Sequence, residues 1–434
     1  MRLEGVTSFA LVGSGLVAIA FGLARYAFGL FVPSIRADLG LAPDTIGIVI
    51  SLAFVGFVLA SIGAPALTDR LGARNAAVTA ATLAATGLAL VAAAGTAVTL
   101  GTGVLICGLS TGMMMPSLTA GMHAAVSPAV HGRVTALMNA STTIGVMVCA
   151  PAAMLLGDDW RLTYASFAAV AAIGVAAAWL RIPSASRAQG HAGGPTPPMS
   201  RRQILSLGRL LAFGFGAGIA GAAFWIFAPD LVTERGGLAG VPTACLWLAV
   251  GIAGIAGAWI SDLADRFGTP MANALALAGI AAGTAMLAAL PGNAASALAA
   301  AAVFGAAFMS LAGLYLVTAV RLLPNRPALA GMAPFLAITI GQAAGSPLVG
   351  RVIDSTGYAA AFQLFAALAL VLAATSVCFP DPATAPAEEP AVPEEHLASA
   401  EAAVEPEPAE PGPTEAPAPI ARSMALEAEA VAEA

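Results

Sequence analysis

The sequence predicts an all-α polytopic membrane protein with twelve transmembrane helices, arranged as two six-helix repeats and followed by a disordered C-terminal tail. Of its 434 residues, 59% are hydrophobic and 10% are charged, whereas an ordinary soluble domain is nearer half apolar and a quarter charged. The mean hydropathy of +0.87 excludes a water-soluble globule, which needs far more polar surface. Unbroken apolar runs of about 20 residues predict helical spans instead of the alternating segments of a β-barrel.

Twelve apolar runs are the predicted spans. They cover residues 7–33, 46–67, 76–94, 98–122, 133–156, 161–180, 206–232, 243–261, 270–291, 295–320, 329–350 and 358–379. Residues 181–203 are rich in Pro, Gly and Arg, and we interpret them as a cytoplasmic linker. This linker joins an N-terminal bundle, residues 1–180, to a C-terminal bundle, residues 204–379. Short polar clusters such as Arg36–Asp38 mark the predicted breaks between spans.

The tail, residues 380–434, differs from the rest of the chain in charge and composition. It holds 13 acidic residues, one arginine and 11 prolines. Low hydrophobicity and charge of one sign predict disorder, and only residues 421–434 have a composition that allows a short helix. Either the tail binds a partner or it is a solvated overhang.

The composition also excludes several kinds of chemistry. All 18 basic residues are arginines, so the chain has no Walker A lysine, Schiff-base lysine or lysine general base. The four cysteines lie in or beside apolar runs without paired spacing, and the four histidines show no metal-ligand spacing. We therefore expect no enzymatic activity, no cofactor or metal, and no nucleic-acid partner.

Arginine placement predicts the orientation in the membrane. With a cytoplasmic N-terminus, twelve arginines fall on or beside cytoplasmic ends of spans and four fall outside. Cytoplasmic loops carry an excess of basic residues, so we expect both termini in the cytoplasm. The twelve are Arg2, Arg70, Arg74, Arg133, Arg181, Arg187, Arg201, Arg202, Arg209, Arg266, Arg321 and Arg326, and the four are Arg36, Arg161, Arg235 and Arg351.

A short motif occurs twice. Asp69-Arg70-Leu71-Gly72 follows the second run, and Asp265-Arg266-Phe267-Gly268 follows the eighth. The pattern Gly145 to Pro151 in the fifth run and the pattern Gly341 to Pro347 in the eleventh run share the same offset of 196 positions. Two independent features with one offset predict a duplicated six-span unit. Both units begin on the same side, so the repeats are parallel and are related by an axis along the membrane normal.

These motifs resemble the signature of the major facilitator superfamily. The segment from Pro65 to Arg74 is similar to its loop 2–3 motif, G-x-L-x-D-R-x-G-x-[RK], with Pro65 in place of the first glycine. The second copy of the motif resembles the corresponding motif in the second half of these proteins. The resemblance covers about residues 7–379, and it implies the twelve-helix fold of the superfamily and transport of a solute.

Two other segments are similar to the bacterial YbfB-like branch of this superfamily. They are Leu23-Ala-Arg-Tyr-Ala-Phe in the first run and Gly341-Gln342 in the eleventh. Ala150-Pro151 stands where the antiporter motif of the fifth span has Gly-Pro. The antiporter pattern is therefore incomplete.

The resemblance implies a gating role for the repeated motif. In the family, the carboxylate at Asp69 contacts the other half near the start of span 11 in the outward-facing state, where a helix dipole favours negative charge. Arg70 serves the same latch, while Gly72 permits the tight turn that follows. The alternative is that the arginines, Arg74 above all, only determine topology. The second copy contributes Asp265, Arg266 and Gly268.

Arg25 is the most informative single residue. It lies eight residues before Pro33, about 12 Å from the outer end of the first span. A charge at this depth costs at least ~2.5 kcal/mol unless it is paired or faces a cavity. Arg25 either binds an anion in a central cavity, with Tyr26 at its edge, or is a structural residue that pairs with backbone carbonyls or extends to the interface.

Neutral side chains supply the other cavity candidates. The resemblance implies that Trp225, Tyr315 and the Met114 region belong to helices that line the cavity. Asn139 and Gln342 are further polar candidates, although most such residues in membrane helices bond to a neighbouring helix. Adaptable apolar side chains suit a hydrophobic organic substrate.

One carboxylate, Asp230, lies within an apolar run, near the outer end of the seventh span. We interpret it as a solvated helix end, with an outer gate residue as the alternative. Buried acidic residues usually carry the proton in proton-coupled carriers. The scarcity of carboxylates inside the runs therefore argues against proton antiport.

The predicted function is secondary active transport of a small organic solute, an organic anion or a hydrophobic compound, by rocking of two halves around a midplane site. The alternative is the membrane subunit of an ATP-driven transport complex. No HExxH and no paired intramembrane carboxylates indicate an intramembrane enzyme. We expect a monomer in the bacterial inner membrane, with the lipid bilayer and a small-molecule substrate as its partners.

Overall fold

The computed structural model describes residues 3–156, 159–184, 198–255, 257 and 260–382. The described residues form helices and no strand, which confirms the all-α class. Nearly all of the predicted acidic tail and most of the predicted linker lie outside these residues, so the predictions for those two segments are untested.

The N-terminal half begins with one continuous span built from three segments, α1 (Leu3–Val17), the π-helix η1 (Ala18–Tyr26) and α2 (Ala27–Leu39). The helices that follow are α3 (Pro43–Leu71), α4 (Ala73–Ala92), α5 (Ala97–Ala125), α6 (His131–Leu156) and α7 (Trp160–Arg181), with a short 3₁₀ turn, η2 (Pro128–Val130), before α6.

The C-terminal half begins with the longest single α-helix, α8 (Arg201–Glu234). Its Ser200 side chain accepts from the backbone N–H of Gln203 while the Gln203 side chain accepts from the N–H of Ser200, a capping box that fixes where the helix starts. The remaining helices are α9 (Val241–Gly254), α10 (Ile260–Phe267), α11 (Thr269–Ala289), α12 (Ala294–Leu322), α13 (Pro327–Thr356), α14 (Tyr358–Ala374) and the 3₁₀ turn η4 (Thr375–Cys378).

The predicted number of spans agrees with the helices. Eleven helices in the described part of the chain are long and apolar enough to cross a bilayer, and Thr243–Gly254 is a shorter apolar helix. That shorter helix and α10 together occupy the predicted eighth span. Residues 256, 258 and 259 between them lie outside the description.

The helices extend beyond the apolar runs, and this corrects one predicted break. The cluster Arg36–Asp38 lies inside α2, which ends at Gly40 with a φ of 63°. The charged side chains do not end the helix because each has an ion-pair partner, Asp230 for Arg36 and Arg161 for Asp38. Glycine ends the helix instead, since it adopts a positive φ without steric cost.

Both copies of the repeated motif form the same backbone turn. Gly72 separates α3 from α4 with a φ of 78° and a ψ of 158°, and Gly268 separates α10 from α11 with a φ of 81° and a ψ of 154°. A residue with a Cβ is strained at such angles. The two motif copies are thus alike in conformation as well as in sequence.

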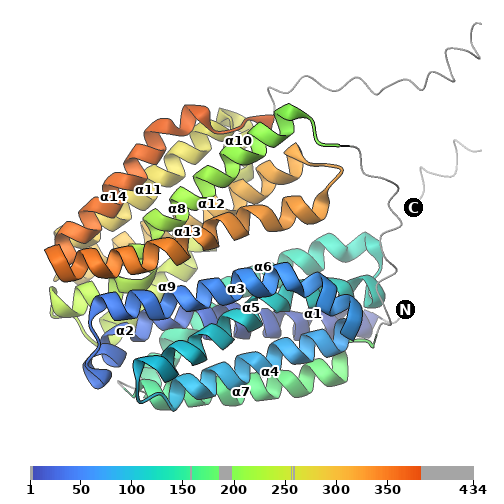
Figure 1. Ribbon diagram of the computed structural model, residues 1–434, viewed down its shortest axis with the longest axis horizontal. Coiled ribbons are helices and arrows are strands. Elements are labelled where there is room, and N and C mark those ends of the chain that lie inside the picture. The colour runs from blue at the N-terminus through green and yellow to red at the C-terminus, as the bar shows by residue number, and fades with distance from the viewer. Residues whose placement is uncertain (1–2, 157–158, 185–197, 256, 258–259, 383–434) are drawn as a thin grey trace, which may run out of the picture. The chain divides into compact units, whose positions relative to one another are not determined.

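We call the end of the helices that holds Arg36 and Asp230 the Asp230 end, and the opposite end, which holds Asp69 and Asp265, the Asp69 end. Between the two halves, α3 packs on α13, α6 on α9 and α2 on α8. In Figure 1 the ribbons of α3 and α13 lie close together at the left and separate toward the right.

Close packing of α3 on α13 depends on glycine. A Cβ added at Gly47 would lie 2.4 Å from the carbonyl oxygen of Ser346, and one added at Gly350 would lie 2.4 Å from that of Pro43. Small residues allow such backbone approach in membrane helices. Both contacts lie toward the Asp230 end, since Pro43 begins α3.

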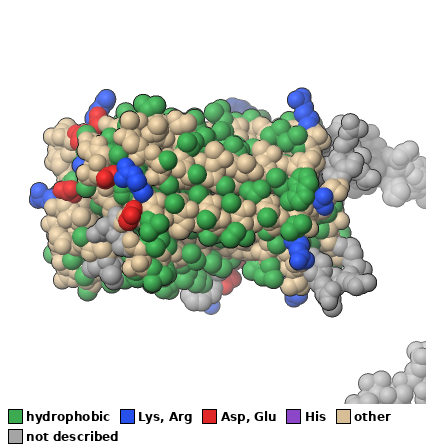
Figure 2. Space-filling model, turned by 90° about the horizontal axis from the view of Figure 1, so that it is seen from below, with side chains coloured by type: hydrophobic (Ala, Val, Ile, Leu, Met, Phe, Trp, Pro, Cys, Tyr) green, Lys and Arg blue, Asp and Glu red, His purple; other side chains and the backbone are tan. Residues whose placement is uncertain are grey.

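The surface has the pattern expected of a membrane protein. On the face drawn in Figure 2, arginine side chains gather at the two ends and apolar side chains cover the band between them. Large exposed hydrophobics such as Leu59, Ile62 and Ile173 belong to the long helices. In water an apolar surface of this extent would aggregate, but in lipid it is the stable arrangement.

Candidate functional site

The first span is distorted where it meets the other half. Residues Ala18–Tyr26 form a π-helix, and the N–H of Ala27 donates to the carbonyl of Gly22, five residues earlier. Wider turns of this kind are rare and are found frequently at functional sites. Arg25 lies in the last turn of this segment.

Arg25 connects the two halves through neutral partners. Its Nη2 donates to Thr339 Oγ1 at 3.1 Å and to Gln342 Oε1 at 3.2 Å, both on α13. The residue is 6% exposed. No carboxylate contacts it in the part of the chain that the structure describes. The predicted alternatives of a backbone-paired or interface-directed arginine are therefore wrong for this structure, since these partners are side chains of the opposite half.

Aromatic rings surround the guanidinium. Its Cζ lies 4.4 Å from the ring centroid of Phe57, 5.2 Å from that of Phe54 and 5.3 Å from that of Tyr26. The ring faces carry partial negative charge and attract the cation. This attraction offsets part of the cost of burying Arg25, but it leaves the charge without a counter-ion.

Trp225 joins this group from α8. Its ring centroid lies 4.8 Å from that of Tyr26, and Trp247 Nε1 donates to the Tyr26 carbonyl at 2.9 Å. The structure thus brings four predicted site residues together, namely Arg25, Tyr26, Trp225 and Gln342. Sequence reasoning missed Thr339, because a lone threonine in a span more often bonds to its own helix.

The other three predicted cavity residues lie elsewhere. Met114 is fully buried in the core that α1, α4, α5 and α6 share. Tyr315 is fully buried too and stacks on Phe379 at 5.4 Å, in the C-terminal half. Asn139 is exposed on α6. None of the three contacts Arg25 within the described residues, so the site is smaller than predicted.

Asp230 requires a correction. It is not a solvated helix end, because the residue is 0% exposed. Arg36 Nη1 donates to Asp230 Oδ2 at 2.5 Å, and the Tyr358 hydroxyl donates to the same oxygen. Arg36 also donates from Nε to the Leu41 carbonyl. The buried ion pair joins α2 to α8 and α14, so it ties the two halves at the Asp230 end.

A second contact closes the same end. The backbone N–H of Asp44, at the start of α3, donates to Asp354 Oδ2 near the end of α13 at 3.0 Å. Neither of these inter-half contacts is visible in the local sequence pattern, since the partners lie 194 and 310 residues apart. Together these two contacts hold the halves against each other at the Asp230 end.

The signature residues at the Asp69 end have different surroundings. Asp69 and Arg70 are exposed, and Asp69 shows no ion pair within the described residues. Arg74 donates from Nε to the Ile182 carbonyl at 2.7 Å and lies over the Trp179 ring, so it fastens α4 to the end of α7.

In the second motif copy, Arg321 Nη1 donates to Asp265 Oδ1 at 2.8 Å. Both partners are about half exposed and lie within the C-terminal half. Arg266 is exposed. In this conformation neither motif carboxylate forms an ion pair with the opposite half among the described residues, and the predicted latch stays a prediction for a different state.

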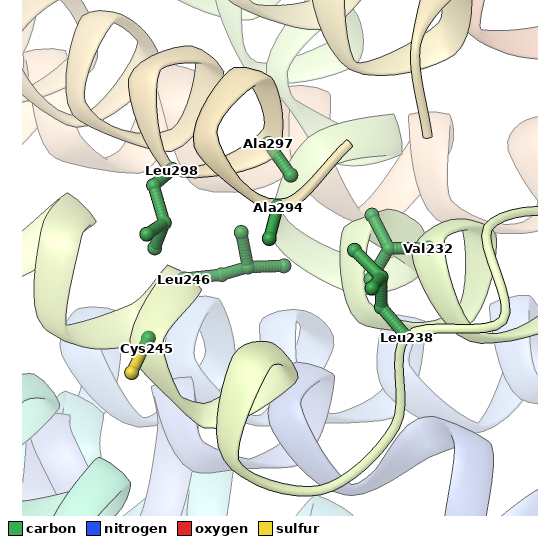
Figure 3. Close-up of a pocket in the computed structure, with 7 residues that line it drawn as sticks. All are labelled: Val232, Leu238, Cys245, Leu246, Ala294, Ala297 and Leu298. Carbon is green, nitrogen blue, oxygen red and sulfur yellow. The ribbon is translucent and has the colours of Figure 1, made fainter. Parts of the chain in front are cut away.

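One further cavity lies at the Asp230 end of the C-terminal half. It has a volume of about 230 Å³ and an apolar lining formed by Val232, Leu238, Cys245, Leu246, Ala294, Ala297 and Leu298. Figure 3 shows these side chains around it. It contains none of the predicted site residues, and it offers no charged group that would orient a solute.

Within the described residues, no group of three or more His, Cys, Asp or Glu side chains is arranged to hold a metal ion. The functional groups around Arg25 are the buried guanidinium, aromatic rings, an amide and a hydroxyl. Such a site can bind and orient a solute.

Comparison with known proteins gives the class. Residues 15–334 match the family model of the Major Facilitator Superfamily. This match spans more than half of the chain, so the chain belongs to that superfamily and is a multi-pass membrane transporter, not an enzyme. A comparison with curated protein sequences finds no match, and the assignment to the YbfB-like branch stays a prediction.

Solved structures share the fold. The nucleoside transporter NupG matches with a TM-score of 0.68 and 16% identity, over 87% of this chain and 99% of that chain. A POT family transporter in complex with 5-aminolevulinic acid matches with a TM-score of 0.70 and 12% identity, over 87% and 96%. A bacterial homolog of the human lysosomal transporter Spinster matches with a TM-score of 0.68 and 14% identity, over 87% and 95%. Identities this low show a common fold alone.

Proposed function

We propose that this transporter is a secondary carrier that moves a small organic anion by alternating access, with Arg25 as the anion-binding residue. One observation carries the proposal: a buried guanidinium without a carboxylate partner bridges the two halves at Thr339 and Gln342. Buried charges need a partner. A substrate carboxylate is the missing partner that fits the planar guanidinium best.

The contacts of Arg25 also supply a reason for coupling. In this conformation its hydrogen bonds go to neutral oxygens, and a carboxylate would add the attraction of an opposite charge and a bidentate geometry. An arriving carboxylate would compete for Nη2 and thereby release Arg25 from α13. Substrate binding would then change a contact between the halves, which alternating access requires.

The conformation fits an inward-facing carrier. The inter-half contacts at Arg25, Gly47, Asp230 and Asp354 all lie between the level of Arg25 and the Asp230 end. The excess of arginine predicts that the Asp69 end lies in the cytoplasm of a bacterial inner membrane. The closed end would then face outward, and the latch at Asp69 would form only after the halves rock.

The proposal is tested by reconstitution. Purified protein in liposomes should take up labelled acetate, lactate or benzoate down an imposed gradient without nucleotide, and Arg25→Ala should abolish this uptake at equal protein content. Uptake that needs an added ATPase and ATP would support the ATP-driven alternative. If uptake is unchanged in Arg25→Ala, Arg25 does not bind the anion, and a neutral, apolar substrate becomes the better proposal.

A further inference from the structure

The side chains around Arg25 offer hydrogen-bond donors that have no partner. Arg25 Nε, Gln342 Nε2 and Trp225 Nε1 are all buried and lack a hydrogen-bond partner among the described residues. Their residues are 6%, 1% and 4% exposed. Buried polar groups are nearly always paired, so unpaired donors on Arg25, on its partner Gln342 and on Trp225, whose ring packs on Tyr26, point to a ligand that accepts hydrogen bonds.

The acceptors beside Arg25 each accept one hydrogen bond from the cation itself. Thr339 Oγ1 and Gln342 Oε1 both accept from Arg25. The acidic residue on α8, Asp230, lies five positions beyond Trp225. Its Oδ2 accepts from Arg36 and Tyr358, its Oδ1 has no partner among the described residues, and Arg36 balances its charge. A ligand ammonium beside Arg25 would therefore meet no carboxylate that lacks a counter-ion.

From this imbalance, and resting on the proposed function, we infer that the substrate is a planar aromatic carboxylate without an amino group. The carboxylate accepts from several donors at once, and Arg25, Gln342 and Trp225 supply them. An amino acid or a nucleoside brings donors of its own, and a buried donor left unpaired is strongly disfavoured.

The walls of the site favour a ring. Tyr26 and Trp225 lie 4.8 Å apart between centroids with their planes tilted by 36°. Phe304 and Phe308 extend this aromatic surface behind Trp225, at 5.7 and 5.5 Å. Aromatic side chains prefer aromatic partners in offset or edge-to-face contact. We infer that a flat ring packs on these side chains when the halves move apart, with its carboxylate at Arg25.

The inference is tested with small ligands that differ in whether they carry a ring, a carboxylate or an ammonium group. Thermal shift or tryptophan fluorescence of the purified full chain would be measured with benzoate, phenylalanine, benzylamine and acetate. We expect benzoate to bind at least roughly tenfold more tightly than phenylalanine, because the ammonium would lie near Arg25 and meet no carboxylate that lacks a counter-ion. Benzylamine should not bind, and acetate should bind more weakly than benzoate because it has no ring.

Two variants address the donors directly. Trp225→Phe keeps a ring and deletes one N–H, so benzoate should bind roughly three- to tenfold more weakly. Trp179→Phe removes an exposed indole elsewhere and is the matched control, which should bind as wild type. Gln342→Glu places a carboxylate beside Arg25 with little change of shape, and should weaken benzoate at least tenfold while leaving the fold intact.

The outcomes separate this inference from the proposed function. If phenylalanine binds as tightly as benzoate, the inference that the substrate has no amino group is wrong, although anion transport would stand. If acetate binds as tightly as benzoate, the inference that the substrate has an aromatic ring is wrong. Benzylamine binding with no response to benzoate would overturn both proposals. Unchanged benzoate affinity in Gln342→Glu would show that the ligand does not reach Arg25.

Discussion

Arg25 is buried in a protein that has few charges inside. Among the described residues, Arg25 and Asp230 are the charged side chains that are buried. Asp230 has a counter-ion in Arg36, whereas Arg25 has hydroxyl, amide and ring partners only. A cost of at least ~2.5 kcal/mol for a charge at this depth is tolerated where function requires it.

The chemistry of the guanidinium leads to the first prediction. Arg25→Lys keeps the charge but replaces a planar fork with a strongly hydrated ammonium that cannot bind a carboxylate in bidentate fashion. We expect normal membrane insertion and a loss of carboxylate uptake of at least roughly tenfold, with complete loss in Arg25→Ala. Uptake assays normalised to protein in the liposomes check this. Wild-type rates in both well-folded variants would mean that Arg25 is structural.

At the scale of elements, α3 and α13 approach so closely that a methyl group does not fit between them. The second prediction is that Gly47→Ala weakens closure of the Asp230 end, because its Cβ would lie 2.4 Å from the Ser346 oxygen. Overpacking of this kind costs about 1–3 kcal/mol. Gly63→Ala, on the same helix with nothing within 4 Å, is the matched control.

The comparison is made by thermal unfolding in detergent and by uptake. A lower midpoint of thermal unfolding and slower uptake for Gly47→Ala than for Gly63→Ala would show that transport requires the close contact of α3 with α13. Equal midpoints and equal uptake would show that α3 and α13 are separate in the working protein.

The ion pair between α2 and α8 gives the third prediction. Removing one partner of a buried pair costs about 3–5 kcal/mol, and we expect the low end here because the Arg36 side chain is 17% exposed. Asp230→Asn should therefore lengthen the distance between spin labels at Ala42 and Ser355, two exposed positions at this end. An unchanged distance distribution would mean that the backbone contacts close this end unaided.

At the scale of the whole molecule, the arginine distribution predicts the orientation. Reporter fusions within residues 181–203 and after Phe379 should both report the cytoplasm, because twelve arginines lie on that side against four on the other. A periplasmic signal from either fusion would reverse the assignment. The Asp230 end would then face the cytoplasm, and the structure would represent an outward-facing carrier.

How far the sequence predicts the molecule depends on the range of each interaction. The spans follow from the cost of exposing backbone in lipid, so hydropathy was sufficient for all twelve, even where α9 and α10 divide one. Arg25 was identified because a charge in an apolar run is conspicuous. Tyr26 and Trp225 followed from the family resemblance, which implies that their helices border the cavity, whereas Gln342 was a candidate because it is a polar residue inside a span.

The partner of Asp230 could not be predicted in this way. Arg36 lies 194 residues away, and nothing in either local pattern pairs the two. Arg36 instead appeared to end a span, and Asp230 appeared to face water. Interactions between the halves depend on how the two bundles pack, and local sequence patterns do not reveal this packing.

The central claim is that a carboxylate at Arg25 drives the two halves from one closure to the other. It is tested most directly by measuring two spin-label distances in one reconstituted protein, Ala42 to Ser355 at the Asp230 end and Ala66 to Ala328 at the Asp69 end. All four positions are exposed. We predict that saturating benzoate lengthens the first distance and shortens the second in wild type, and changes neither in Arg25→Lys. Benzoate uptake by a wild-type protein in which both distances stay constant, or an identical response in Arg25→Lys, would contradict the account.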